Sequence, residues 1–101
     1  MEPQKFKQPT ATVGEHLADF MEDYGIKAPT LAKRLDVGRS RLQRLMEGAR
    51  CDGDMALRLA RAFETTPEYW LNLQALRDLS EAMVTKGQTI SQTVQPLREA
   101  S

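Results

Sequence analysis

Apolar residues recur at helical spacing along most of the chain. The first such stretch lies between residues 13 and 24, where four apolar side chains fall three or four positions apart: Leu17, Phe20, Met21 and Tyr24. Gly25 follows as a natural helix stop. The pattern also predicts two short helices over 28–35 and 39–47, the first with Pro29 in its opening turn, where no backbone donor is missed.

Two longer helices are predicted in the second half of the chain. A helix over 53–63 can be capped by Asp52. The apolar positions on its inward face are Met55, Leu59 and Phe63. Thr66 and Pro67 have the residue types of an N-cap and a first helical position, and they open a fifth helix that we expect to end near Lys86–Gly87.

The two ends of the chain follow no clear pattern. Residues 1–12 are polar and carry two prolines, which predicts a flexible arm. After residue 87, Thr and Val favour a strand, whereas the spacing of Ile90, Val94 and Leu97 favours a helix. We therefore predict an all-α protein with an arm over 1–12, a five-helix domain over 13–84 and a tail over 85–101.

The length and amino-acid composition of the chain limit the class of protein to which it can belong. With 101 residues, 41% hydrophobic and 28% charged, the chain fits one small globular domain. The single cysteine excludes an internal disulfide and fits a reducing cytoplasm. No stretch approaches the ~20 apolar residues of a membrane span. We therefore expect a cytoplasmic protein with no membrane partner.

Candidate catalytic chemistry is sparse. One histidine and one cysteine make a zinc site improbable, and no cofactor or metal is expected. His16 is expected to be an exposed helix residue. Cys51 is expected to be a passive thiol, with a redox role as the alternative because nearby Arg50 could lower its pKa. Glycine-rich phosphate loops and paired carboxylates are absent from the sequence. The chain is therefore predicted not to be an enzyme.

Positive charge is concentrated in one segment of a neutral chain. The whole sequence has 14 Lys+Arg against 14 Asp+Glu. Residues 33–50 nevertheless carry a net charge of +4 (six basic residues less two acidic ones). The basic residues are Lys33, Arg34, Arg39, Arg41, Arg44 and Arg50, and the acidic ones are Asp36 and Glu47. The simplest alternative for such a cluster is a solvated helix face that only keeps the protein in solution.

The same segment has the pattern of a helix-turn-helix motif. Five apolar positions fix its two short helices to a core: Leu31, Leu35, Val37, Leu42 and Leu45. Ala32 is small where the helices cross, and Asp36 stands where the turn needs a residue that tolerates left-handed backbone. The outward positions of the second helix are then Arg39, Ser40, Arg41, Gln43, Arg44 and Glu47. An α-helix fits the DNA major groove and arginine can bind guanine bidentately, so we predict DNA binding.

Two stretches of the sequence resemble known families. LAKRLDVGRSRLQRLMEG resembles the helix-turn-helix of the Xre/Cro–repressor superfamily. DMALRLARAFETTPEYWLNLQ, together with VGEHL, resembles HigA-type antitoxins of the VapI group, and the match covers roughly residues 13–84. The resemblance implies a lambda-repressor-like fold and a homodimer that binds a palindromic operator and represses its own operon. It also implies neutralisation of a RelE-like, mRNA-cleaving toxin by direct binding.

The resemblance assigns residues to the DNA contact. Arg39, Ser40 and Arg44 fall where relatives contact bases, and Arg41, Gln43 and Arg50 fall at or near the DNA backbone. Four positions depart from the family pattern: Lys27 and Ala28 replace common Ser and Gln, Gly38 replaces a capping Ser, and Glu47 replaces Asn. Lys27 can replace a phosphate contact electrostatically, Gly38 keeps the N-cap position without its hydroxyl, and Glu47 repels phosphate.

Two further surfaces have candidate roles, and one stretch is predicted to be buried. The first helix carries Glu15, Asp19, Glu22 and Asp23, which form either a solvated face or a docking surface for a basic toxin. The fifth helix is apolar nearly all round at its start, which predicts burial of Tyr69, Trp70, Leu71 and Leu73. Farther along it, the stripe Leu76, Leu79 and Met83 is predicted to form a dimer interface.

Two other functions stay open. A stand-alone Xre-type repressor would have the same DNA-binding face but no toxin partner. A protein-interaction module that has lost operator binding would explain Glu47, Ala28 and the neutral overall charge.

Overall fold

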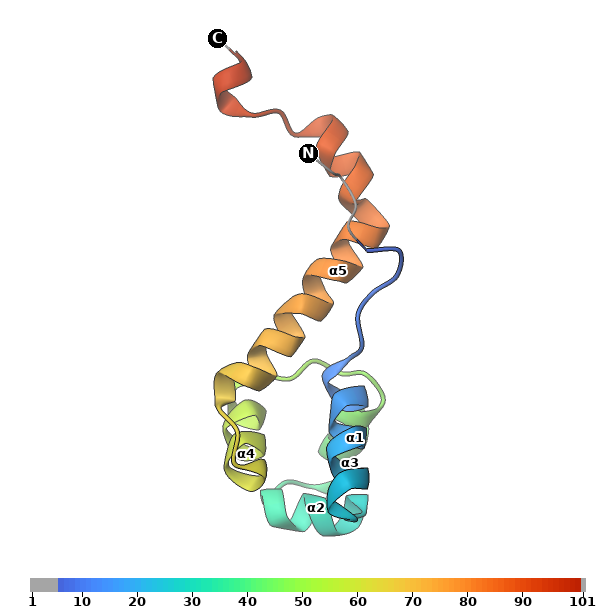
Figure 1. The fold of residues 1–101 in the computed structure, drawn as a ribbon, viewed down its shortest axis with the longest axis vertical. Coiled ribbons are helices and arrows are strands. Elements are labelled where there is room, and N and C mark those ends of the chain that lie inside the picture. The colour runs from blue at the N-terminus through green and yellow to red at the C-terminus, as the bar shows by residue number, and fades with distance from the viewer. Residues whose placement is uncertain (1–5, 101) are drawn as a thin grey trace. The chain divides into compact units, whose positions relative to one another are not determined.

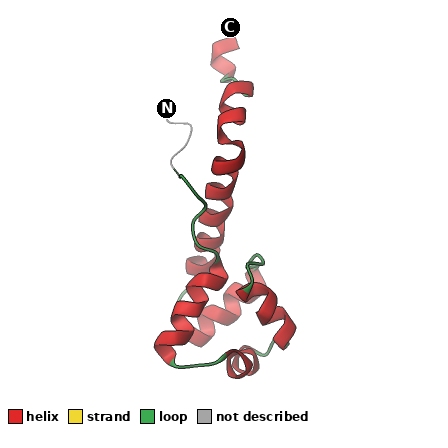
Figure 2. Cartoon of the chain, turned by 90° about the vertical axis from the view of Figure 1, so that its right-hand side faces the viewer, coloured by secondary structure: helices red, strands yellow, loops and turns green. Residues whose placement is uncertain are grey.

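The structure is a computed structural model that describes residues 6–100 of the chain. Within that range it contains helices and loops but no strand, which confirms the all-α prediction (Figure 2). The helices are α1 (Val13–Tyr24), α2 (Ala28–Leu35), α3 (Arg39–Met46), α4 (Gly53–Phe63), α5 (Pro67–Thr93) and the short 3-10 helix η1 (Leu97–Ala100) (Figure 1).

The described chain forms two compact units. One unit comprises Ala11–Ala75 and holds α1 to α4 with the start of α5. The other comprises the chain from Leu76 onward together with the segment that ends at Thr10. The helix-turn-helix lies entirely within the first unit.

The helices of the first unit begin and end at the residues that the sequence indicates. Thr12 and Glu15 form a capping box at α1: the Glu15 backbone N–H donates to Thr12 Oγ1 at 3.1 Å and the Thr12 N–H to Glu15 Oε1 at 2.8 Å. Asp52 caps α4 by accepting from the Met55 N–H at 2.9 Å. Gly25 ends α1 in the left-handed region, at φ 64°.

A single core joins these helices. Its buried apolar side chains are Val13, Leu17, Met21, Leu31, Ala32, Leu35, Leu42, Leu45, Cys51, Met55, Ala56, Leu59, Ala60, Phe63 and Trp70. Helix α1 packs on α3 at Gly14, which is buried and where any Cβ would overlap the carbonyl oxygen of Leu45. Glycine at this position therefore sets how closely the two helices approach.

The start of α5 is anchored by aromatic contacts. Trp70 is fully buried, its ring lies 5.0 Å from Phe20 and 6.1 Å from Phe63 between centroids, and its Nε1–H donates to Thr65 Oγ1 at 2.7 Å. The prediction that the helix is buried all round here was wrong for Tyr69 and Leu71, each 38% exposed. Only one face of the first turns of α5, the face with Trp70, is therefore buried against the core.

Helix α5 is longer than predicted. It continues through Gly87 to Thr93, so the end expected near Lys86–Gly87 was wrong and residues 88–93 are helical. A glycine in a helix interior costs only about 1 kcal/mol relative to alanine, which does not force an end. Hydroxyls of the last turns bond back to the preceding turn, as Thr93 Oγ1 does to the Thr89 carbonyl at 2.9 Å. No helix among residues 6–100 has the length and apolarity to cross a membrane.

The C-terminal end of the predicted arm has hydrogen-bond partners far away along the chain. Thr10 donates its N–H to Ser80 Oγ at 2.9 Å and accepts from Arg77 Nη1 at 2.7 Å. Thr12 is the N-cap of α1. These partners lie up to 70 residues away along the chain, so local sequence could not reveal them. Residues 1–5 of the predicted arm lie outside the described part of the chain.

Candidate nucleic-acid interface

The turn between α2 and α3 has the geometry that its sequence predicts. Asp36 adopts the left-handed conformation, at φ 58°, and its N–H donates to the Lys33 carbonyl at 3.1 Å. Ala32 is 2% exposed, and Leu42 and Leu45 on α3 are buried. These contacts fix α3 relative to α2 and leave its opposite face outward.

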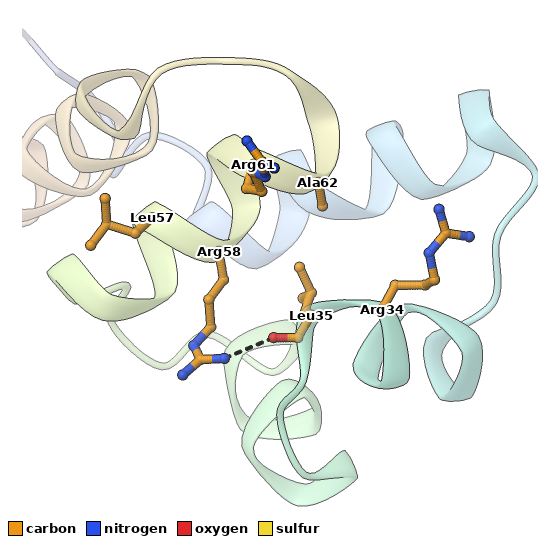
Figure 3. Close-up of a pocket in the computed structure, with 6 residues that line it drawn as sticks. All are labelled: Arg34, Leu35, Leu57, Arg58, Arg61 and Ala62. Atoms are coloured by element: carbon orange, nitrogen blue, oxygen red, sulfur yellow. Dashed lines mark hydrogen bonds between the residues drawn. The ribbon is translucent and has the colours of Figure 1, made fainter.

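Arg58 on α4 stabilises the same turn. Its Nη1 donates to the carbonyl oxygen of Leu35 at 2.9 Å, at the end of α2 (Figure 3). The same Nη1 donates to the carbonyl oxygen of Asp36 at 3.1 Å. A cation suits the negative end of the helix dipole and satisfies carbonyls that lack intrahelical partners. Sequence analysis did not assign this role to Arg58, because its partners are backbone atoms 22 and 23 residues away.

The predicted DNA-contacting residues of α3 lie at its surface. Arg39, Ser40, Gln43 and Arg44 are exposed, and Arg41 is partly exposed. Gly38 is the N-cap of α3 and Lys27 the N-cap of α2; both are exposed, and neither cap makes a side-chain hydrogen bond. Arg39, Ser40 and Arg44 are therefore all exposed on one short helix at the surface of the domain.

A notch of about 110 Å³ gathers the predicted backbone-contacting arginines. It is lined by Arg41, Arg44, Leu45, Ala49, Arg50, Asp52 and Met55. Arg41 and Arg44 come from α3, and Arg50 comes from the loop before α4. Three guanidinium-bearing residues around one small hollow suit an anionic group such as a phosphate.

Arg41 is already paired within the chain. Its Nη2 lies 2.9 Å from Asp54 Oδ1 and 3.4 Å from Asp52 Oδ1. Asp54 Oδ1 also accepts from Arg58 Nε at 2.7 Å. The hydrogen bonds from Arg58 and then Arg41 hold the pKa of Asp54 below its usual value, because they favour its charged form.

The pairing of Asp52 and Asp54 with Arg41 was not predicted from the sequence. The spacing of Asp54 and Arg58, four residues apart on one helix, could have predicted their ion pair. The link to Arg41 spans 13 residues and two helices, so it needs the fold. Glu47, which is predicted to repel phosphate, also has a partner within the chain. Gln43 Nε2 donates to Glu47 Oε2 at 2.8 Å.

The predicted toxin-binding residues divide into two kinds. Glu15 accepts hydrogen bonds from Thr12 in the capping box and therefore has a structural role in α1. Asp19, Glu22 and Asp23 are exposed on the same helix, whose last turn carries no basic residue. The structure thus leaves an acidic surface built from three of the four residues.

The predicted dimer stripe lies on the part of α5 that belongs to the second unit. Leu76 is 42% exposed, Leu79 is 55% exposed and Met83 is partly exposed. Ile90 and Val94 are also exposed farther along the chain. The second unit therefore presents several large apolar side chains outward.

The remaining candidates are structural in character. Cys51 is buried, its N–H donates to Gln74 Oε1 at 2.8 Å, and burial followed by the charge of Asp52 raises the pKa of its thiol to about 11. Desolvation outweighs the lowering of this pKa by the charge of Arg41, so the result agrees with the expected passive thiol and not with the alternative of a thiol activated by Arg50. His16 is partly rather than fully exposed. Among residues 6–100, no group of three or more His, Cys, Asp or Glu side chains could hold a metal.

The comparisons with known proteins agree with this geometry. Residues 16–75 match the family model of the Cro/C1-type helix-turn-helix DNA-binding domain. A Haemophilus influenzae protein named as an HTH-type transcriptional regulator is 43% identical over 75 residues, 72% of this chain and 69% of that protein. Antitoxin HigA-1 of Vibrio cholerae is 38% identical over 77 residues, 75% of this chain and 73% of that one.

A solved structure extends the likeness to three dimensions. It is Pseudomonas aeruginosa antitoxin HigA with the higBA promoter, 31% identical, covering 86% of this chain and 97% of that one with a TM-score of 0.81. The fold, the family match over residues 16–75 and the identity with HigA-1 lead to one conclusion. The chain belongs to the Cro/C1-type helix-turn-helix family and, within it, to the HigA-type antitoxins.

Proposed function

We propose that this antitoxin binds the operator of its own promoter as a homodimer, represses its operon, and neutralises a RelE-like mRNA-cleaving toxin by direct binding. The observation that carries the DNA-binding part is the exposed face of α3, which presents Arg39, Ser40 and Arg44 beside the arginine-lined notch. In this proposal Arg39, Ser40 and Arg44 read base edges. Their types suit the task, since arginine binds guanine bidentately and serine bonds several bases.

The backbone contacts position this reading helix. In this proposal Arg41 and Arg50 bind phosphate at the notch, and Gln43 binds the DNA backbone from the exposed face of α3. Lys27 attracts phosphate from the start of α2. Gly38 lets the DNA backbone approach the first turn of α3, because it has no side chain and open space around it. Such contacts carry most of the affinity and its salt dependence but no sequence information.

The dimer interface is assigned to Leu76, Leu79 and Met83. Exposed apolar side chains at this spacing on one helix are typical of a helix–helix contact. A two-fold dimer would present two copies of α3 to half-sites about 34 Å apart, which suits a palindromic operator.

The toxin surface is assigned to Asp19, Glu22 and Asp23, with Glu15 beside them. An enzyme that cleaves RNA must bind a polyanion, so an acidic helix can attract and cover its basic site. The variant Asp19→Lys/Glu22→Lys/Asp23→Lys keeps the capping box of Glu15 and should lose toxin in a co-purification. Glu68→Lys, on the first turn of α5, is the charge-reversal control. Unchanged toxin retention in the triple variant would remove this surface from the proposal.

A gel shift with the DNA upstream of the gene, run at several salt concentrations, tests operator binding. Wild-type protein should shift this DNA less as salt rises, and Arg39→Ala/Arg44→Ala should not shift it specifically. Absence of a wild-type shift at low salt would favour the interaction module. A stand-alone repressor is the second candidate, favoured by the Haemophilus influenzae relative that is named only as a transcriptional regulator. Absence of a neighbouring gene for a small basic protein would favour that reading.

A further inference from the structure

We infer that Asp54, assisted by Asp52, competes with DNA phosphate for Arg41, so that operator binding requires Arg41 to exchange a carboxylate of its own chain for a phosphate. The inference rests on the proposed operator binding and adds a residue that limits its strength. It concerns the α4 side of the notch, where Asp52 is a lining residue and Asp54 is paired with the lining residue Arg41.

The geometry places the competitors on the same guanidinium. Arg41 Nη2 donates to Asp54 Oδ1 at 2.9 Å and also reaches Asp52 Oδ1 at 3.4 Å. Arg41 is at the same time a lining residue of the notch with Arg44 and Arg50. An arginine held by carboxylates offers less of its charge and fewer of its donors to an incoming phosphate.

The exchange is feasible because Asp54 has a second partner. Arg58 Nε donates to Asp54 Oδ1 at 2.7 Å, so this carboxylate stays paired after Arg41 leaves. The side chains of Arg41 and Asp54 are 35% and 55% exposed, and ion pairs this exposed contribute little to stability. Arg58 also remains fixed by the carbonyl oxygens of Leu35 and Asp36, so the turn need not move.

The variant Asp54→Asn tests the competition with little change of shape. It removes the negative charge and keeps an oxygen that can accept from Arg58. We expect it to bind the upstream DNA about two- to five-fold more tightly than wild type, the size typical of an exposed ion pair. The plot of log K against log salt should become steeper by up to about one, because the nearer of the two carboxylates at Arg41 has lost its charge.

Asp52→Asn gives a second, independent variant. Asparagine caps a helix as well as aspartate does, so the cap on Met55 is retained while the more distant carboxylate at Arg41 is lost. We expect Asp52→Asn to increase the affinity for the upstream DNA as well, but by less than Asp54→Asn does. Glu68→Gln removes one exposed negative charge from the first turn of α5 and is the matched control, with no comparable gain expected.

The decisive comparison repeats Asp54→Asn in an Arg41→Ala background, with thermal unfolding of each variant measured beside its DNA affinity. The gain should disappear there, because the competitor has nothing left to compete for. A gain that persists without Arg41 would mean general charge repulsion and would overturn the inference. If the folded Asp54→Asn variant binds the DNA no more tightly than wild type, the inference is also overturned. The proposed function is unaffected by that result as long as the wild-type protein binds the DNA. Absence of binding by wild type would overturn both.

Discussion

Arg58 on α4 donates through Nη1 to the carbonyl oxygen of Leu35, 2.9 Å away at the end of α2. A third helix thus braces the turn of the helix-turn-helix, and the same guanidinium is held by Asp54 through Nε. The hydrogen bond to Asp54 raises the pKa of Arg58, because it favours the charged form. The turn that precedes α3 is therefore held in part by a side chain outside the helix-turn-helix motif.

Replacing Arg58 by methionine should weaken the turn. The variant keeps much of the side-chain length but leaves the carbonyl oxygens of Leu35 and Asp36 without these donors. We expect a lower melting temperature and weaker operator binding, measured by circular dichroism and gel shift. Arg61→Met, one turn along α4 and exposed, is the control and should melt like wild type. Equal melting temperatures of the two variants would show that the hydrogen bonds of Arg58 to this turn do not stabilise the protein.

Gly14→Ala should destabilise the first unit although alanine is the better helix former. The added Cβ would overlap the Leu45 carbonyl, and relieving such overpacking costs about 1–3 kcal/mol, more than the ~1 kcal/mol gained in helix propensity. Urea unfolding measures the difference. Gly53→Ala, at the first position of α4 with open space around it, is the matched control and should be neutral or slightly stabilising. A Gly14→Ala variant as stable as the control would contradict the close crossing of α1 and α3.

Cys51 should react slowly and should make stability fall at high pH. Burial raises the pKa of its thiol from 9.0 to about 11, so at pH 8 almost no thiolate is present in the folded protein. The unfolded chain loses this proton near pH 9 and the folded chain near pH 11, so the thiol's contribution to stability declines as pH rises between these values. Thiol labelling at pH 8 and melting between pH 8 and 11 test both points. Cys51→Ala should show less of this decline, and fast labelling of the folded protein would contradict the assignment.

The apolar stripe of α5 should control self-association. Leu76→Gln/Leu79→Gln places two polar side chains on the proposed interface, and both positions are already exposed, so the monomer should still fold. Light scattering after size exclusion should give a dimer for wild type and a monomer for the variant. Leu57→Gln on α4, where the leucine is 62% exposed, is the control and should remain dimeric. A dimer that survives the double substitution must form through other residues.

Local features were predictable from the sequence. Asp36 was expected at a left-handed position and Thr66 at an N-cap, and both are found there because turn and cap chemistry act within a few residues. Helix α5 passed through Gly87, however, since a single glycine lowers helix stability without setting an end.

Contacts that depend on the fold were not predictable. The pairing of Arg41 with Asp54 joins two helices, and the bonds from Thr10 to Ser80 join residues far apart in sequence. Gly14 also carried no local signal, because its role is defined by the Leu45 carbonyl on another helix. The residue types on the exposed face of α3 could therefore be predicted, whereas the carboxylates that pair with Arg41 could not.

Fluorescence anisotropy with two duplexes measures whether α3 binds DNA in a sequence-specific way. One duplex carries the upstream DNA and the other a shuffled sequence of equal composition. Wild type should prefer the first, and Arg39→Ala should reduce that preference about 5- to 150-fold, as loss of one base contact does. Arg61→Ala, with the same loss of charge away from α3, should keep the preference. If wild type binds both duplexes with equal affinity, or if Arg39→Ala leaves the preference unchanged, α3 does not recognise the base sequence through Arg39.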